Sequence, residues 1–369
     1  MAVYRTCRRQ VAAGIHRSRA RSDLTAWCQW SRFCGWLGVP TDLAGITDPV
    51  PILQLFAERV RSGVLAAGGG RVTKGTVEGY LRAVAQIYAS VGAQDPRLDA
   101  VGKLDFRLKR QFAAYRKEDP PSWRVRPIPL QLLHHVYEHL HGGDAQHAAV
   151  ADLAYIAFFF LLLPGEYCDG GSESDSTPFR LRDVTFYIGN RRFSALTATA
   201  QQIRDATYVS LFFTTQKNGI KGEAIGHGKS GHPTACPVQR IGARVRYLQS
   251  RGARPDAPLS SIYFQGKWRS IKSTEITSAL RASATSIGDT VGLRPKEISA
   301  RSLRAGGAMA LLLGKVDTDT IKLVGRWRSD AMLVYLHVSA RPIMQQHAST
   351  MVRHGAYALI PGPPTADQE

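Results

Sequence analysis

The sequence predicts a mainly α-helical protein with a small antiparallel β-sheet, made of a helical N-terminal domain and a larger C-terminal domain. Apolar residues recur at three- and four-residue steps through most of the chain, which is typical of helices. Strand-like stretches are limited to Val184–Leu196 and Tyr208–Thr214. A segment rich in proline and charge, Lys117–Pro129, is the best candidate for the domain boundary.

The N-terminal region is predicted to hold four helices. The first places Trp27, Trp30 and Phe33 on one apolar face and ends before Gly38 and Pro40. We interpret these aromatic residues as core rather than as a platform for stacking bases. The expected helices span residues 25–37, 52–64, 73–92 and 101–115, with a glycine-rich link at 66–71.

The C-terminal region is predicted to mix helices with the two strands. Ala148–Leu163 is a hydrophobic core helix, Gln216–Gly219 is a turn, and Gly266–Arg269 is a tight basic turn around Trp268. A flexible loop is expected at 226–237. Further helices are expected at 130–140, 237–250, 272–288, 318–324 and 337–353. The predicted segments are a basic arm (1–22), a helical domain (23–118), a linker (119–129), a second domain (130–354) and a disordered tail (355–369).

The chain carries a strong excess of positive charge. Lys and Arg number 48 against 29 Asp and Glu, a formal net charge of +19, which favours a polyanionic partner such as DNA or RNA. The arginine-rich first 22 residues fit either an arm on a nucleic-acid backbone or an organelle transit peptide. No apolar run reaches the about 18 residues of a membrane span. Five scattered cysteines without a C-x-x-C pair are typical of a reduced, intracellular protein.

Two groups of histidines invite a metal hypothesis that their spacing does not support. The first group lacks a carboxylate or thiolate at ligand spacing, and the second lacks a fourth ligand. We therefore predict no metal site here. No other cofactor and no small-molecule substrate are expected either. The residues concerned are His134, His135, His139 and His141 in the first group, and His227, His232 and Cys236 in the second.

The most informative stretch runs from residue 298 to residue 337. Ser299 is placed to cap a helix whose first turns carry Arg301 and Arg304. Gly306 and Gly307 in that helix cost about 1 kcal/mol each against alanine, so we expect another element close to the backbone there. A short helix then ends at Gly325 and is followed by Arg326, Trp327 and, nine positions after Arg326, Tyr335.

This order of residues resembles the late motif of the tyrosine recombinase (phage integrase) superfamily, which is roughly H-x-L-R, then L-G-H/W, then Y. The matching positions hold Arg301–Arg304, Val324–Arg326 and Tyr335. The segments SLRAGGA and GRWRSDA are similar to those of integrase-like proteins of eukaryotic mobile elements. The resemblance implies a core-binding domain that clamps DNA, over residues 23–118, followed by a tyrosine-recombinase catalytic domain.

The resemblance also implies a catalytic set. Tyr335 would attack the scissile phosphate, Arg304 would bind its oxygens, and Lys217 would donate a proton to the departing 5′ oxygen. Arginine suits the clamp because its planar fork makes two parallel bonds to phosphate. Arg326 stands in the His/Trp slot with Trp327 beside it. Taken singly, each of these residues also fits an ordinary backbone-phosphate contact or a helix interface.

Two positions depart from the family pattern. Glu166 matches an R-x-x-E turn, but Leu163 stands where the first clamping arginine belongs, with Arg180 and Arg182 the nearby alternatives. Arg301 replaces the motif histidine and cannot shuttle a proton, because it stays protonated. Each lost charge donor typically costs about 100- to 1,000-fold in rate.

The sequence leaves three hypotheses open. The first is a DNA strand-exchange enzyme with a 3′-phosphotyrosine intermediate, and the second is a DNA-binding relic or domesticated integrase that no longer cuts. The third is a basic RNA-binding protein. On the first two we expect double-stranded DNA as partner, self-association on DNA and, in a eukaryote, a nuclear location. Lys74, Lys109 and Arg110 are then candidate phosphate contacts, or otherwise members of a solvated face.

Overall fold

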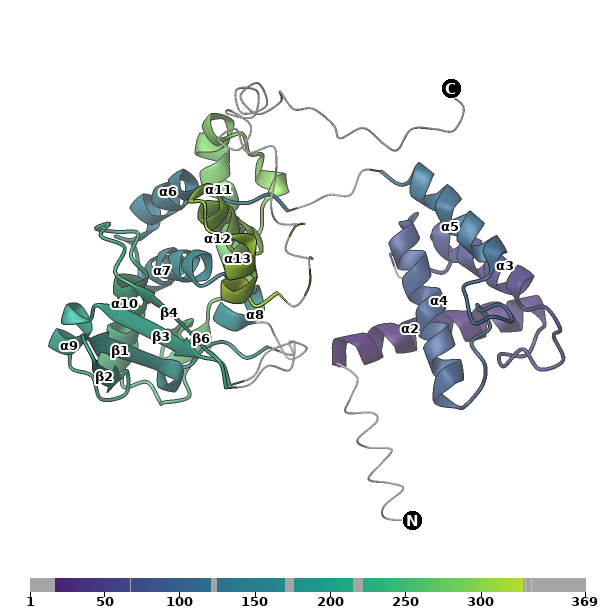
Figure 1. Cartoon of the computed structure of the whole chain (residues 1–369), viewed down its shortest axis with the longest axis horizontal. Coiled ribbons are helices and arrows are strands. Elements are labelled where there is room, and N and C mark those ends of the chain that lie inside the picture. The colour runs from purple at the N-terminus through teal and green to yellow at the C-terminus, as the bar shows by residue number, and fades with distance from the viewer. Residues whose placement is uncertain are drawn as a thin grey trace, which may run out of the picture. The chain divides into compact units, whose positions relative to one another are not determined.

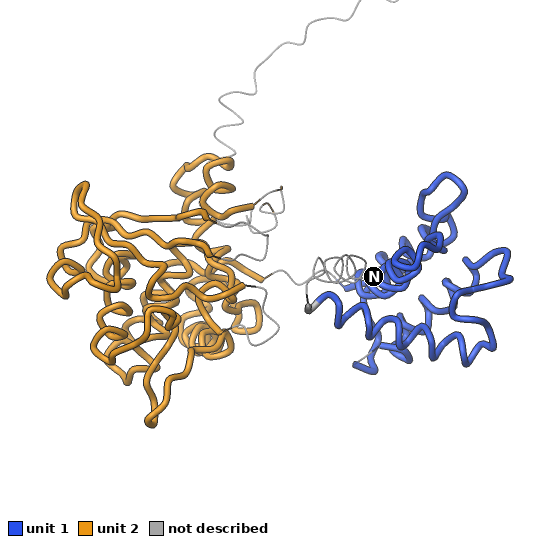
Figure 2. Tube along the Cα trace, turned by 90° about the horizontal axis from the view of Figure 1, so that it is seen from below, with its two compact units in different colours: residues 1–123 blue, residues 124–369 orange. Residues whose placement is uncertain are grey.

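The computed structural model describes residues 17–66, 68–120, 125–169, 176–214 and 222–327, together with 329 and 333. The chain divides into two compact units, Met1–Trp123 (unit 1) and Arg124–Glu369 (unit 2), coloured separately in Figure 2. The architecture is mainly helical with a small antiparallel sheet, which confirms the predicted fold class. No helix in the described ranges is both long and apolar enough for a membrane crossing.

In its described residues, unit 1 has four helices around their own apolar core, and Figure 1 shows how they are arranged. Trp30 and Phe33 of the first helix are fully buried against Phe56 of the second, with the Trp30 and Phe56 rings 5.1 Å apart. The predicted core role of these aromatic residues is therefore confirmed. The helices are α2 (Arg17–Leu37), α3 (Val50–Arg61), α4 (Lys74–Ser90) and α5 (Phe106–Glu118).

The first and last of these helices begin several residues away from their predicted starts. Helix α2 begins at Arg17 rather than at Thr25. Helix α5 begins at Phe106 rather than at Val101, because Asp105 caps it: the Asp105 carboxylate accepts a hydrogen bond from the Arg107 backbone N–H at 2.8 Å.

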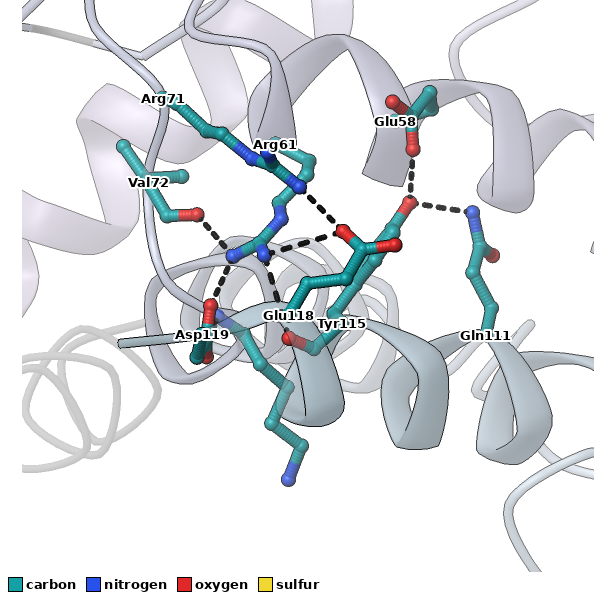
Figure 3. Close-up of polar contacts among 9 residues, drawn as sticks. Glu58, Arg61, Arg71, Val72, Gln111, Tyr115, Glu118 and Asp119 are labelled. Atoms are coloured by element: carbon teal, nitrogen blue, oxygen red, sulfur yellow. Dashed lines mark hydrogen bonds and ion pairs between the residues drawn. The ribbon is translucent and has the colours of Figure 1, made fainter. Parts of the chain in front are cut away.

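A buried arginine ties the end of α5 to the other helices of unit 1 (Figure 3). Arg61 is only 3% exposed; it forms an ion pair with Asp119 and donates to the backbone carbonyls of Val72 and Tyr115. The second carboxylate oxygen of Asp119 accepts from the Lys74 backbone N–H at 2.8 Å, at the start of α4. One carboxylate thus fixes the end of α5, the N-terminus of α4 and the buried Arg61.

This arrangement predicts an acid-sensitive contact. Burial alone would raise the pKa of Asp119, but its bonds to Arg61 and Lys74 outweigh burial, so the pKa lies below its usual 3.8. Because the pKa of Asp119 is lower in the folded state than in the unfolded state, the ionised carboxylate stabilises the fold at pH values above 3.8. This stabilisation is lost as the pH falls from 3.8 through the folded-state pKa. We expect Asp119→Asn to reduce the hydrogen-exchange protection of the Lys74 amide at neutral pH. The further loss of this protection in acid should then be smaller in the variant than in the wild type.

The exposed carboxylate of Asp42 in the same unit supplies the control, Asp42→Asn. A wild-type and an Asp119→Asn acid profile that superimpose would show that Asp119 does not cap α4.

Unit 2 is built around α7, which is buried on all sides and packs against α6, α10 and α12. A four-stranded antiparallel sheet, in the order β2-β1-β3-β4, and a separate β5-β6 hairpin lie beside the helices (Figure 1). The helices are α6 (Leu130–Leu140), α7 (Ala145–Phe159), α8 (Pro164–Tyr167), α9 (Ala200–Asp205), α10 (Pro237–Ser250), α11 (Ser273–Val291), α12 (Ser302–Leu313) and α13 (Thr318–Gly325), with 3-10 turns η1 (Leu181–Asp183) and η2 (Pro295–Glu297). The strands are β1 (Val184–Ile188), β2 (Arg191–Ser194), β3 (Tyr208–Phe212), β4 (Ala224–Gly228), β5 (Ser261–Phe264) and β6 (Lys267–Ser270).

Several expectations about unit 2 were wrong in detail. The single strand predicted at 184–196 is a hairpin, β1 and β2, because Gly189 adopts a left-handed φ of +55° and turns the chain. Part of the predicted flexible loop forms β4, which pairs with β3. The basic turn predicted at 266–269 lies one step earlier, at Gln265–Gly266, so that Trp268 belongs to β6.

The predicted close approach at the paired glycines is confirmed. A Cβ atom on Gly306 would lie 2.3 Å from the carbonyl oxygen of Ile128, and one on Gly307 would lie 2.1 Å from that of Phe158 in α7. Helix α12 begins at Ser302, so the prediction that Arg301 lies in its first turn and Ser299 is its cap was wrong. The Ser299 hydroxyl accepts from the Arg301 N–H at 3.3 Å one step ahead of the helix.

Candidate functional site

Two arginines and one glutamate meet where the end of α7, α8, α12 and α13 come together. Arg304 lies in α12, Arg326 directly follows α13, and Glu166 lies in α8; their exposed fractions are 5%, 8% and 3%. Figure 1 shows α12 and α13 side by side with α8 close to them, consistent with the packing of α12 against α7 and α13. We call Arg304, Arg326 and Glu166 the arginine site.

Arg304 directs both terminal nitrogens of its guanidinium at backbone carbonyls. Nη1 donates to the Leu161 carbonyl at 2.9 Å, and Nη2 donates to the Gly325 carbonyl. The guanidinium carbon lies 4.2 Å from the centroid of the Trp327 ring, a cation–π distance. Arg304 therefore links α7, α12 and the end of α13.

Arg326 donates hydrogen bonds to several groups of the protein. Nη1 donates to the carbonyls of Phe160 (3.3 Å) and Val324 (3.0 Å), and Nη2 donates to Leu161 (3.2 Å) and to Oε2 of Glu166 (3.0 Å). Its Nε is buried and meets no acceptor among the described residues. Burial lowers the pKa of Arg326, and the Glu166 carboxylate opposes this shift.

Unusual backbone conformations create this arrangement. Leu161 has φ +49°, which ends α7 four residues earlier than the sequence predicts and presents its carbonyl to both guanidinium groups. Arg326 has φ +58° and forms the left-handed cap of α13. A Cβ atom at Gly325 would lie 1.7 Å from the Trp327 ring, so only glycine allows that ring to fold back there.

The pairing of Arg326 with Glu166 is the contact in the arginine site that the sequence did not predict. Glu166 accepts from the Leu163 backbone N–H at 2.8 Å and carries the ion pair to Arg326 on the same oxygen. A guanidinium thus reaches Glu166 although position 163 is leucine. A signal was present, because a single acid inside the apolar run LLLPGEYC needs a buried cation.

The structure places the other predicted catalytic residues only in part. Arg301 is exposed just before α12, and Trp327 stacks on Arg304. Tyr335 and Lys217 lie outside the described residues. Arg180 and Arg182 flank the buried Leu181 in the 3-10 turn η1.

The three predicted phosphate contacts of unit 1 differ in how their charges are balanced. The Lys74 Nζ is 2.7 Å from Glu78. Lys109 and Arg110 are exposed on α5, and the Arg110 guanidinium lies 5.5 Å from the centre of the Phe106 ring.

Four of the described histidines lie in two stacked pairs. No group of three or more metal-ligating side chains occurs in the described ranges. His134 bonds Tyr155 at 2.8 Å and stacks on His232 at 4.9 Å, and burial lowers the pKa of His134. His135 stacks on His139 at 3.9 Å. Cys34, Cys168 and Cys236 are buried free thiols, and Cys28 is an exposed one.

Comparison with known proteins gives the fold. The sequence matches no family model and no curated protein. Among solved structures, XerH site-specific recombinase in a post-cleavage complex with its difH substrate is similar at 14% identity, over 84% of this chain and 74% of that chain, with a TM-score of 0.50. Tn1549 transposon integrase (12% identity, 83% and 85%, TM-score 0.45) and XerA recombinase (13%, 95% and 96%, 0.39) are similar too. The similarity to XerH shows that the chain has the fold of the tyrosine recombinases.

Proposed function

We propose that this protein binds duplex DNA and has an impaired ability to cleave and rejoin it through a 3′-phosphotyrosine at Tyr335. The arginine site is the observation that carries the proposal: it brings Arg304 and Arg326 together beside the turn that bears Glu166. The fold supports it, since XerH was solved bound to a DNA substrate, and so does the net charge of +19. Self-association on DNA and an intracellular, in a eukaryote nuclear, location belong to the same proposal.

The chemistry of the arginine site supports the proposed impairment. Attack of the Tyr335 hydroxyl on phosphorus builds negative charge on the non-bridging oxygens, which cationic donors must stabilise. The terminal donors of Arg326 are used by the protein itself, and position 163 offers only leucine. Loss of even one such donor typically slows the reaction about 100- to 1,000-fold.

The second candidate function is DNA binding without cleavage. The ion pair between Arg326 and Glu166 favours it, because a guanidinium that neutralises a buried carboxylate serves the fold and not a substrate phosphate. On this proposal the protein is a relic or domesticated integrase. Binding of RNA is the remaining alternative; competition between duplex DNA and single-stranded RNA at several salt concentrations separates it from both.

A nicked suicide duplex distinguishes the two DNA proposals. We expect a weak covalent protein–DNA adduct that Tyr335→Phe abolishes and that Tyr263→Phe, at an exposed tyrosine of β5, leaves unchanged. Leu163→Arg together with Arg301→His is expected to increase the rate of adduct formation about tenfold or more. The absence of any adduct in the wild type and in the restored variant, while both still bind the duplex, would favour binding without cleavage.

A further inference from the structure

A strongly basic pocket lies between α9, α10 and the end of β4. Arg204 comes from α9, Lys229 directly follows β4, and Arg240 and Arg246 come from α10; the volume is about 230 Å³. Figure 1 shows α9 next to α10, on the other side of unit 2 from α8 and α13. The pocket is therefore separate from the arginine site.

The positive charges in this pocket exceed the negative charges that face them. Arg240 is neutralised by buried Asp152, with Nη1 3.0 Å from Oδ1. Arg204 instead bonds the neutral amide of Gln201 at 2.7 Å, and Lys229 Nζ lies 3.5 Å from the backbone carbonyl oxygen of Arg204. In the described part of the chain, no carboxylate forms an ion pair with Arg204, Lys229 or Arg246.

Arg246 lies partly buried among these positive charges, close to the contact between α9 and α10. Its pKa is lowered first by burial and then by the positive charges of Arg204 and Arg240, with Asp152 opposing. A Cβ atom on Gly242, one turn earlier in α10, would lie 2.9 Å from Ile203 of α9 and 3.4 Å from Nη1 of Arg246. Glycine at 242 thus allows α9 and the Arg246 guanidinium to pack closely over α10.

Such a cluster of positive side chains favours the binding of an anion. Like charges that share a pocket destabilise the fold unless a counter-charge enters, and arginine forks match the oxygens of a phosphate. Since a water molecule takes up about 30 Å³, the pocket has room for a small anion and several waters. We infer that the pocket between α9, α10 and β4 binds a phosphate group, either of a nucleic-acid backbone or of a free phosphorylated molecule.

The nucleic-acid source rests on the proposed function, whereas the free anion does not. Inorganic pyrophosphate is the first probe, added to the full chain at constant ionic strength while thermal unfolding is measured. A ligand that binds only the folded state raises the unfolding temperature with its concentration. We expect this rise in the wild type and its loss in Arg204→Gln/Arg246→Gln.

The control, Arg251→Gln/Arg254→Gln, removes the same charge from exposed positions outside the pocket and should keep the rise. Without anion, the pocket variant should be at least as stable as the wild type, since it relieves repulsion. If the pocket variant is this stable, the loss of its pyrophosphate response comes from lost binding and not from unfolding. Equal pyrophosphate responses of all three proteins, with equal DNA binding, would overturn the inference.

Duplex DNA is the second probe, with affinity measured by fluorescence anisotropy over a series of salt concentrations. If a backbone phosphate occupies the pocket, the salt slope of the pocket variant should fall by about one for each phosphate that it no longer binds. An abolished pyrophosphate response with an unchanged slope identifies a free anion as the ligand. A wild type that binds no duplex contradicts the proposed function alone, and the pyrophosphate measurement still decides on the pocket.

Discussion

Glu166→Ala is expected to lower the free energy of unfolding of unit 2 by about 3 to 5 kcal/mol, because it leaves Arg326 as a buried cation without its carboxylate. Both side chains of the pair are almost fully buried, at 6% and 4% exposure, so solvent cannot replace the missing partner. The substitution also removes the acceptor of the Leu163 N–H. Urea unfolding of the full chain, with hydrogen exchange assigning the transition to unit 2, measures the loss.

The matched control is Glu138→Ala, which removes an exposed carboxylate from α6 and should change stability by no more than about 0.5 kcal/mol. Replacing both partners, in Glu166→Gln/Arg326→Met, should recover much of the loss because no unpaired charge remains buried. A double variant as unstable as Glu166→Ala would mean that the ion pair is not the source of the effect.

Gly307→Ala is expected to destabilise unit 2 by about 2 kcal/mol or more. The added methyl group would lie 2.1 Å from the Phe158 carbonyl oxygen and 2.3 Å from Cδ2 of Leu161. Overpacking a core costs about 1 to 3 kcal/mol, and contact with main chain belongs at the upper end or beyond because backbone cannot rotate away. The gain in helix propensity, about 1 kcal/mol, offsets only part of this cost.

Gly142→Ala is the control for that substitution, since nothing lies within 4 Å of the added atom. Thermal unfolding of the two variants beside the wild type provides the comparison. A Gly307→Ala protein as stable as Gly142→Ala would show that α12 can move away from α7 at little cost, contrary to the packing described above.

Local signals in the sequence predicted much of the fold. Helix α10 spans residues 237–250 as expected, because Pro237 opens it and its apolar face repeats at helical spacing. Gly306 and Gly307 indicated that another element lies close to the backbone of this helix, because glycine inside a helix is otherwise unfavourable. The glycines of 226–228 misled in the opposite direction: they suggest a loop, whereas pairing with β3 makes a strand.

The candidate site could be predicted only as a set of positions. The order of Arg304, Arg326 and Tyr335 along the chain resembles the late motif of the tyrosine recombinases, but it does not show where a guanidinium points. The bond between Glu166 and Arg326 joins residues 160 positions apart, and no periodicity connects them. It depends on the left-handed backbone of Arg326, a conformation that the sequence does not signal for arginine. The catalytic roles of Tyr335 and Lys217 stay predictions.

The carbonyl oxygen of Leu161 has a consequence for how variants of this protein combine. It accepts hydrogen bonds from Arg304 at 2.9 Å and from Arg326 at 3.2 Å, so one oxygen serves two cations. Removing either side chain changes the acceptor that remains for the other. The energetic contributions of the two arginines are therefore epistatic, and neither can be assigned a value that holds in the absence of the other.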